Sequence, residues 1–184
     1  MRKLLVLAVS CFMWTVGIAV ASGNDELVVK RVSGDVQVGA FEGSEWAQLE
    51  TGARLKQIDS IQVGEGEAEL ALYKKTVLRL GPGSRMTLIE LGVETTGFYI
   101  SKGKVNVEYT PEPAKKLMFE TAAGLAEPKG KAVFIVEVTD DGAMEVSVHQ
   151  GTVAASGDKC RRDVKKGTAV LIDSESCSSR ILEK

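Results

Sequence analysis

The sequence has a single histidine, His149, and no segment longer than a few residues with the apolar spacing of a helix. Histidine is the side chain that titrates near neutral pH without perturbation, so one copy leaves little room for acid–base catalysis. His149 precedes Gln150-Gly151 at the end of an expected strand, and we interpret it as a surface turn residue. The sequence also lacks a nucleophile elbow and a phosphate-cradling glycine loop between a strand and a helix. We therefore expect a protein that is not an enzyme; the alternative is a hydrolase whose site the sequence does not mark.

Charged side chains cluster in short doublets. Asp140-Asp141 has the residue type used in glycosidase and calcium sites, but Gly142 follows it between two strong strand patterns. We interpret this pair as a hairpin turn. The lysine doublets are Lys74-Lys75, Lys115-Lys116 and Lys165-Lys166, and we interpret them as solvated turns; the alternative is contact with anionic glycan or lipid headgroups.

A basic excess is also missing, and long apolar runs are confined to the start of the chain. Arg2-Lys3 precedes the apolar run Leu4–Val20, and Ala19-Val20-Ala21 is typical of a signal-peptide cleavage site. We expect residues 1–21 to be a cleaved secretory signal and residues 22–184 to be one domain in the periplasm or outside the cell.

Without Arg2 and Lys3, 21 basic residues remain against 25 acidic ones, a net charge of -4. Such a chain has no electrostatic reason to bind nucleic acid, and no second apolar run is long enough to span a bilayer.

Cysteine is scarce, with three copies in 184 residues. Cys11 follows Ala8-Val9-Ser10, which hints at lipoprotein cleavage, although the apolar run continues beyond it. Removal of the signal leaves Cys160 and Cys177, an even pair in an oxidising compartment, and we predict a disulfide between them. A metal site needs more ligands than two distant cysteines and one histidine provide, so we expect no metal and no cofactor.

Short alternating apolar runs with glycine-rich turns make up the rest of the chain. The stretch 68–91 predicts three strands, separated by Lys74-Lys75 and Gly81-Pro82-Gly83-Ser84. Elsewhere the pattern predicts strands, which we place at 26–32, 36–41, 46–49, 98–100, 105–109, 117–121, 132–138, 144–149, 153–155, 169–172 and 178–182. Turns are predicted at 33–35, 64–66 and 101–103; residues 122–130 fit a short helical turn, a loop or an edge strand. The fold class is all-β, a wound, solenoid-like or sandwich-like sheet of many short strands.

One short motif recurs, Gly-x-Val-x-small, at Gly34, Gly103 and Gly151. Each copy places a glycine before a strand with two inward side chains. The spacings are unequal, so this is no strict repeat, but a wound sheet can reuse such a device.

The ordered set of motifs resembles a FecR-like domain, the extracytoplasmic module of iron-dicitrate-type anti-sigma regulators and of stand-alone secreted proteins. The resemblance covers about Val29 to Ala155. The segments that carry it are Val29–Val38, Trp46–Gly64, Ala68–Ser84, Lys102–Val107, Phe119–Val136 and Val146–Val153. Three turns depart from the family pattern: Gln57-Ile58-Asp59 replaces the usual Gly-Asp, Lys74-Lys75-Thr76 replaces Asp-Gly-Ser, and Lys129-Gly130-Lys131 replaces Arg-Gly-Thr.

The resemblance implies a non-catalytic module that binds another cell-envelope protein or a cell-wall polymer. In the regulators, an anti-sigma segment and a transmembrane helix precede this domain, whereas here a signal peptide is expected directly before it, so direct sigma-factor control is not implied. The rival interpretation is a periplasmic lipid- or glycan-binding protein. That role requires an open apolar groove for lipid, whereas a binding module requires a filled interior.

Overall fold

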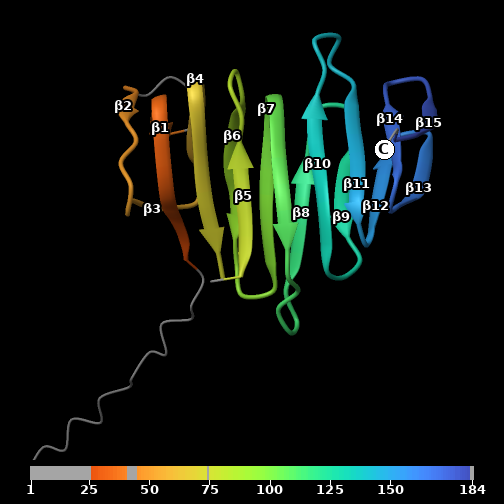
Figure 1. The fold of residues 1–184 in the computed structure, drawn as a ribbon, viewed down its shortest axis with the longest axis horizontal. Coiled ribbons are helices and arrows are strands. Elements are labelled where there is room, and N and C mark those ends of the chain that lie inside the picture. Colours follow the sequence, from red (N-terminus) through yellow and green to blue (C-terminus); the bar gives the residue numbers. More distant parts are fainter. Residues whose placement is uncertain (1–25, 41–44, 74, 183–184) are drawn as a thin grey trace, which may run out of the picture.

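The computed structural model describes residues 26–40, 45–73 and 75–182, which form an all-β protein (Figure 1). Its hydrogen bonds join fifteen strands into one continuous sheet. The strands are β1 (Leu27–Ala40), β2 (Ala47–Gln48), β3 (Arg54–Leu55), β4 (Asp59–Leu72), β5 (Thr76–Leu80), β6 (Arg85–Leu91), β7 (Thr95–Tyr109), β8 (Lys116–Glu120), β9 (Leu125–Pro128), β10 (Ala132–Val138), β11 (Met144–Gln150), β12 (Thr152–Gly157), β13 (Cys160–Lys165), β14 (Thr168–Ile172) and β15 (Cys177–Ile181). The all-β prediction is confirmed, and so are the three strands of the 68–91 stretch. The expected signal peptide 1–21, with Cys11, lies outside the described residues.

Three long strands, β1, β4 and β7, each pair with different strands along their two halves. The second half of β4 pairs with β5 and its first half pairs with β6, and both β5 and β6 then pair with β7. Past β7, one series continues through β10, β11, β14 and β15, and the other through β8, β9, β12 and β13. We define layer A as β5, β10, β11, β14 and β15, and layer B as β6, β8, β9, β12 and β13. Each layer also includes the adjoining halves of the long strands.

The two layers face each other across a filled core. Phe98 and Val107 are nine residues apart on β7, about 30 Å in a flat extended strand. Yet Phe119, which pairs with Phe98, has its ring 5.8 Å from that of Phe134, which pairs with Val107. The long strands must therefore bend so that the layers stack. Phe98, Phe119 and Phe134 are fully buried between them, with Phe98 stacked on Phe119 at 5.5 Å.

The bends occur at glycines that the sequence analysis assigned to turns. Gly34 and Gly103 both have φ near +78°, a conformation that glycine adopts without steric cost. They are also points of close approach: a Cβ at Gly34 would collide with the carbonyl oxygen of Glu65, and one at Gly103 would lie 2.6 Å from the Cα of Ser84. The recurring Gly-x-Val motif therefore marks bends between layers, and its third copy, Gly151, lies between β11 in layer A and β12 in layer B.

Three predicted turns are consequently wrong. Residues 33–35 lie inside β1, residues 64–66 inside β4 and residues 101–103 inside β7. Each long strand continues through its glycine, and β1 and β4 remain paired on both sides of Gly34 and Gly66 with a register shift. A glycine in the sequence does not distinguish a tight turn from a bend within a strand, because a positive φ occurs in both. Among the options for residues 122–130, the structure has a tight turn at Thr121–Gly124 followed by β9.

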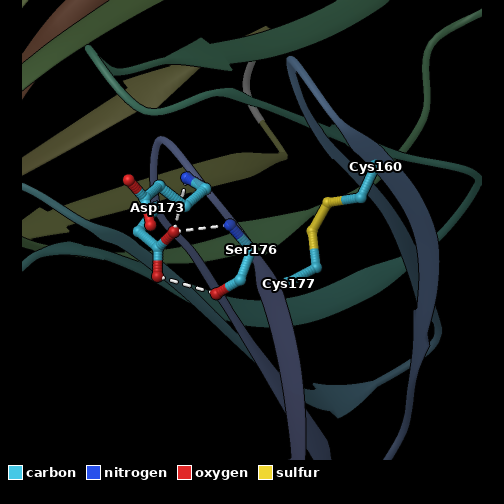
Figure 2. The surroundings of a disulfide bond; sticks show 5 residues. Cys160, Asp173, Ser176 and Cys177 are labelled. Atoms are coloured by element: carbon cyan, nitrogen blue, oxygen red, sulfur yellow. Dashed lines mark hydrogen bonds between the residues drawn. A yellow bond between two sulfur atoms is a disulfide. The ribbon is translucent and has the colours of Figure 1, made fainter.

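The disulfide joins the two layers at the C-terminal end of the protein. Cys160 begins β13, the last strand of layer B, and Cys177 begins β15, the last strand of layer A; their Cα atoms are 6.3 Å apart (Figure 2). Asp173 organises the turn before Cys177. Its carboxylate accepts hydrogen bonds from the backbone N–H groups of Glu175 and Ser176 at 2.7 and 2.6 Å, and from the Ser176 hydroxyl at 2.9 Å. The predicted disulfide is thus present in the structure.

Candidate binding surfaces

The residues considered for catalysis lie apart from one another or serve turns. His149 is exposed near the end of β11. Asp141 lies in the β10–β11 turn, where its carboxylate accepts a hydrogen bond from the Thr139 hydroxyl, which lowers the pKa of Asp141. The Gly142 N–H donates to the Thr139 carbonyl at 2.9 Å, which closes the predicted hairpin.

An acidic cavity of about 180 Å³ lies near this turn, a feature that the sequence analysis missed. It is lined by Asp141, Asp158 and Asp173, from three separate loops. Asp173 is committed to its own turn, and the hydrogen bond from the Glu175 N–H is the largest of the causes that lower its pKa. Within the described parts of the chain, no group of three or more histidine, cysteine or acidic side chains is placed to hold a metal ion.

The lysine doublets have different surroundings. The Lys115 ammonium lies 4.3 Å from the centre of the Tyr73 ring, and burial lowers its pKa. Lys165 and Lys166 are exposed beside the turn before β14. Lys74 lies outside the described residues.

The outer face of layer A is covered by ion pairs between neighbouring strands. Arg79 on β5 bonds to Glu108 on β7 and to Glu69 on β4, the latter at 2.8 Å, and these bonds raise the pKa of the guanidinium. Further pairs follow on the same face: Arg31–Glu67, Lys104–Glu137 and Arg180–Glu145. Most of these side chains are exposed, so each pair adds little to stability. Their effect is to neutralise this face.

Layer B has ion pairs near β9 and β13, Lys129–Asp163 at 2.7 Å and Arg161–Glu127 at 3.9 Å, and at its other end its outer face carries a row of amide side chains. Strand register places Gln48, Gln37 and Gln62 directly beside one another on β2, β1 and β4. The row continues to Arg85 on β6 and Lys102 on β7. Their neighbours Val36, Ile61 and Met86 are buried in the core, so the row points outward. We call these five residues the glutamine row; it spans about 19 Å at a strand spacing of ~4.8 Å.

Two aromatic side chains flank the glutamine row. The Arg85 guanidinium lies 4.8 Å from the centre of the Trp46 ring, within range of a cation–π contact. Tyr99, half-buried on β7, pairs with Thr87 of β6. Thr87 bonds to the Ser60 hydroxyl at 2.7 Å, and both are buried on this outward side of the layer, so neighbouring side chains cover them. No signal in the sequence groups these residues, because four separate segments contribute them.

The edges of the two layers differ in how they are protected. At the N-terminal end, the segment from β2 to β3 lies along β1, with the Leu49 N–H donating to Val36 and the Gly52 N–H to Val29. At the other end, β13 carries Arg161, Arg162 and Lys165, which discourage further pairing. β15, in contrast, pairs with β14 in regular register, and among the described residues no strand covers its outer edge.

Comparison with known protein families shows which family this chain belongs to. A profile of the family described as FecR protein matches residues 59–154, just over half of the chain. The chain belongs to the FecR family. The matched region begins at β4, later than the resemblance from Val29 read off the sequence, and ends in β12. The FecR region therefore includes the bend of β7 and the core phenylalanines, while β1–β3 and β13–β15 flank it.

Solved structures agree with the fold. Two crystal structures of a Parabacteroides distasonis protein described as an anti-sigma factor match with a TM-score of 0.59 each, at 19% and 18% identity. The match covers 67% of this chain and 60% of theirs, so this chain spans less than two thirds of their length. At this identity the likeness concerns the fold alone. A search of curated proteins gave no match. No helix in the described parts of the chain is long and apolar enough to cross a membrane.

Two non-glycine residues with positive φ, Ile58 and Tyr73, lie in or directly before turns that differ from the pattern expected from the resemblance. Ile58, within the Gln57-Ile58-Asp59 turn, has φ +72° and a 57% exposed side chain. Its N–H donates to the Leu88 carbonyl at 2.7 Å, and Asp59 closes the turn by accepting from the Lys56 N–H at 2.8 Å. Tyr73, before the second departure, has φ +52°.

Proposed function

We propose that this protein is a non-catalytic, extracytoplasmic FecR module, associated with signalling, that engages another protein of the cell envelope. Membership of the FecR family supports a regulatory role, and the disulfide between Cys160 and Cys177 supports an oxidising compartment. The exported unit in this proposal is residues 22–184, in the periplasm or secreted, after removal of the signal expected at 1–21. A cell-wall polymer is the second kind of partner.

The outer edge of β15 is the observation that carries the proposal. An exposed strand edge offers unpaired backbone groups to a partner's strand, a common mode of protein recognition. Arg180, the one charged residue of β15, is paired with Glu145 at 2.6 Å and adds no net charge there. β15 is therefore the edge best suited to accept a strand.

Hydrogen-bond alternation identifies which N–H groups point outward. The β14–β15 hairpin is bracketed by bonds from the Asp173 N–H to Ser176 and from the Leu182 N–H to Gly167. Residues alternate between bonded and non-bonded positions in an antiparallel pair. The Ser178 N–H therefore faces β14, whereas the Ser179 N–H faces the open edge.

A pair of proline variants tests this mode. Ser179→Pro removes an outward N–H and leaves the β14 ladder intact, so the protein should keep its melting temperature but lose partner binding. Ser178→Pro removes a ladder bond and should lower the melting temperature. Binding is measured by crosslinking in intact envelopes from a photoreactive residue at position 178, followed by identification of the bound protein. Equal crosslinking by Ser179→Pro would exclude strand addition at β15, and the absence of any crosslinked protein from every exposed face would refute the protein-binding function.

The lipid-binding alternative has less support. Acyl chains held between the layers need an open apolar groove, but the space between β7, β8 and β10 is filled by Phe98, Phe119 and Phe134. The two cavities near β9 and β12 are lined mainly by polar and small residues. Copurified lipid in native mass spectra would reverse this preference.

A further inference from the structure

We propose that the glutamine row on the outer face of layer B is a binding site for an acidic polysaccharide. The inference rests on the proposed function only in placing the domain outside the cytoplasm, and it assigns a site distinct from the β15 edge. It is carried by the register that aligns Gln48, Gln37 and Gln62 with Arg85 and Lys102.

The chemistry of the row matches sugar hydroxyls. A glutamine amide both donates and accepts hydrogen bonds, as a hydroxyl does, and carries no charge that must be neutralised. Neighbouring amides are one strand spacing apart, ~4.8 Å, which is close to the width of one sugar ring. A chain of sugars laid across the strands would therefore meet about one side chain of the row per ring, first amides and then cations, and the whole row would take about four rings.

The two aromatic rings add flat apolar surface beside the amides. Trp46 and Tyr99 are both half-exposed, and an aromatic face packs well against the C–H groups on one side of a sugar ring. Trp46 is held by the Arg85 guanidinium 4.8 Å from its centre, so its ring is positioned before any ligand arrives. Preorganisation of this kind lowers the cost of ordering the site on binding.

The charge at one end of the row specifies an acidic sugar. Arg85 and Lys102 are exposed and adjacent in register, and neither forms an ion pair with a described residue. On layer A, by contrast, Arg79 and Lys104 are paired with glutamates. The Gln37 amide donates to the Asp35 carboxylate at 3.3 Å, so β1 contributes one acidic neighbour to the row. The two unneutralised cations on β6 and β7 match a polymer whose hydroxyls are interrupted by carboxylates.

The test is calorimetric titration of the exported, purified protein with two acidic polymers and a neutral one. Polygalacturonate oligomers and solubilised peptidoglycan glycan strands are the acidic probes, and dextran is the neutral probe. Trp46 is the one tryptophan outside residues 1–21, so its fluorescence reports contact with the row directly. We expect at least one acidic polymer to bind, to shift this fluorescence and to bind more weakly as salt rises.

Variants at the row separate binding from folding. Arg85→Gln should weaken binding about tenfold or more, because a charge-assisted hydrogen bond is lost. Gln62→Ala should also weaken it, while Arg85→Lys should retain much of it; the melting temperature should stay within a few degrees of wild type in all three. Lys104→Gln is the matched control, since it removes an exposed cation from the opposite face and should leave binding unchanged.

Two results overturn the inference. One is the absence of binding to both acidic polymers; the other is binding that Arg85→Gln and Gln62→Ala leave unchanged. If these variants instead abolish crosslinking to an envelope protein while no polysaccharide binds, the face is a protein surface: the inference fails and the proposed function stands. Failure of strand addition at Ser179 does not affect the polysaccharide result.

Discussion

Residues with left-handed backbone conformations are of two kinds in this protein. Gly34 combines a positive φ with a close backbone approach, whereas Gly83 has φ +72° and open space around its Cβ position. Ile58 occupies the same backbone region with a branched side chain. These three positions allow backbone strain and steric collision to be measured separately.

Gly34→Ala should destabilise the protein much more than Gly83→Ala. At Gly83 the methyl group meets only the left-handed penalty, about 1–2 kcal/mol. At Gly34 the same penalty is joined by collision with the carbonyl of Glu65, across the point where β1 and β4 bend together. Denaturant unfolding of both variants checks this; equal losses would mean that the close approach is relaxed at no cost.

Ile58→Gly should leave stability unchanged or raise it by up to about 1 kcal/mol. A branched residue in this conformation stores about 1–3 kcal/mol of strain, which glycine removes at an entropic cost of about 1 kcal/mol. The side chain is 57% exposed, so little packing is lost. A clear loss of stability would show that Ile58 makes contacts worth more than its strain. Because Ile58 is both strained and exposed, contact of this turn with a partner should also be measured for this variant.

At the scale of elements, the C-terminal hairpin depends on its crosslink more than on its side chains. Of the five residues of β15, four are exposed and Cys177 is half-buried. The strand is held by pairing with β14, by the Arg180–Glu145 ion pair and by the disulfide. Hydrophobic burial contributes little here, so changes at the crosslink should have local effects.

Replacing Cys177 by serine, with Cys160→Ser to avoid a free thiol, should lower stability by about 3 kcal/mol, the chain-entropy value for a loop of this length. The measurement is urea unfolding of the double variant beside the oxidised wild type. Wild-type protein reduced with dithiothreitol should match the variant. No difference between oxidised and reduced protein would mean that the bond does not form.

Acid should weaken the turn that presents Cys177. Hydrogen bonds in the folded state lower the pKa of Asp173, so its contribution is fully present above the ordinary carboxyl pKa, about 3.9, and is lost as pH falls through the lowered value. Melting temperatures should therefore fall less steeply below pH 4 in Asp173→Asn than in wild type. Parallel pH profiles would show that the carboxylate charge is unimportant there.

Strand pattern was easier to predict than strand length or pairing. Period-two alternation located β5, β6, β10 and β11 because each has a buried face between clear turn residues. It failed at Gly34 and Gly103, where the local signal for a bend equals that for a turn. The glutamine row was out of reach for a different reason: Gln37, Gln62 and Arg85 meet only through long-range register, which local spacing does not encode.

For the whole molecule, stability depends on one core that both layers share. Leu72, on layer A at the end of β4, and Phe134, at the centre of β10, are both completely buried. Phe134 contacts Phe119 of the opposite layer edge to face. A charge at either site should therefore affect the entire fold.

Leu72→Asp and Phe134→Asp should each destabilise the protein by several kcal/mol, since each removes a buried apolar side chain, worth about 1.5–3 kcal/mol, and buries a carboxylate in its place. Thermal melting measures both. Ile181→Asp, at an 81% exposed position, is the control and should melt within a few degrees of wild type. Unchanged melting of the two core variants would show that the strand register is wrong.

The bent strands have a consequence for how this molecule comes apart. Because β1, β4 and β7 each run from one layer into the other, neither layer can peel away while its partner stays intact. Amide protons on the two halves of β7 should accordingly exchange with solvent at one common rate, through a single opening event. Pulling on the ends of the chain should rupture this body in one step rather than layer by layer.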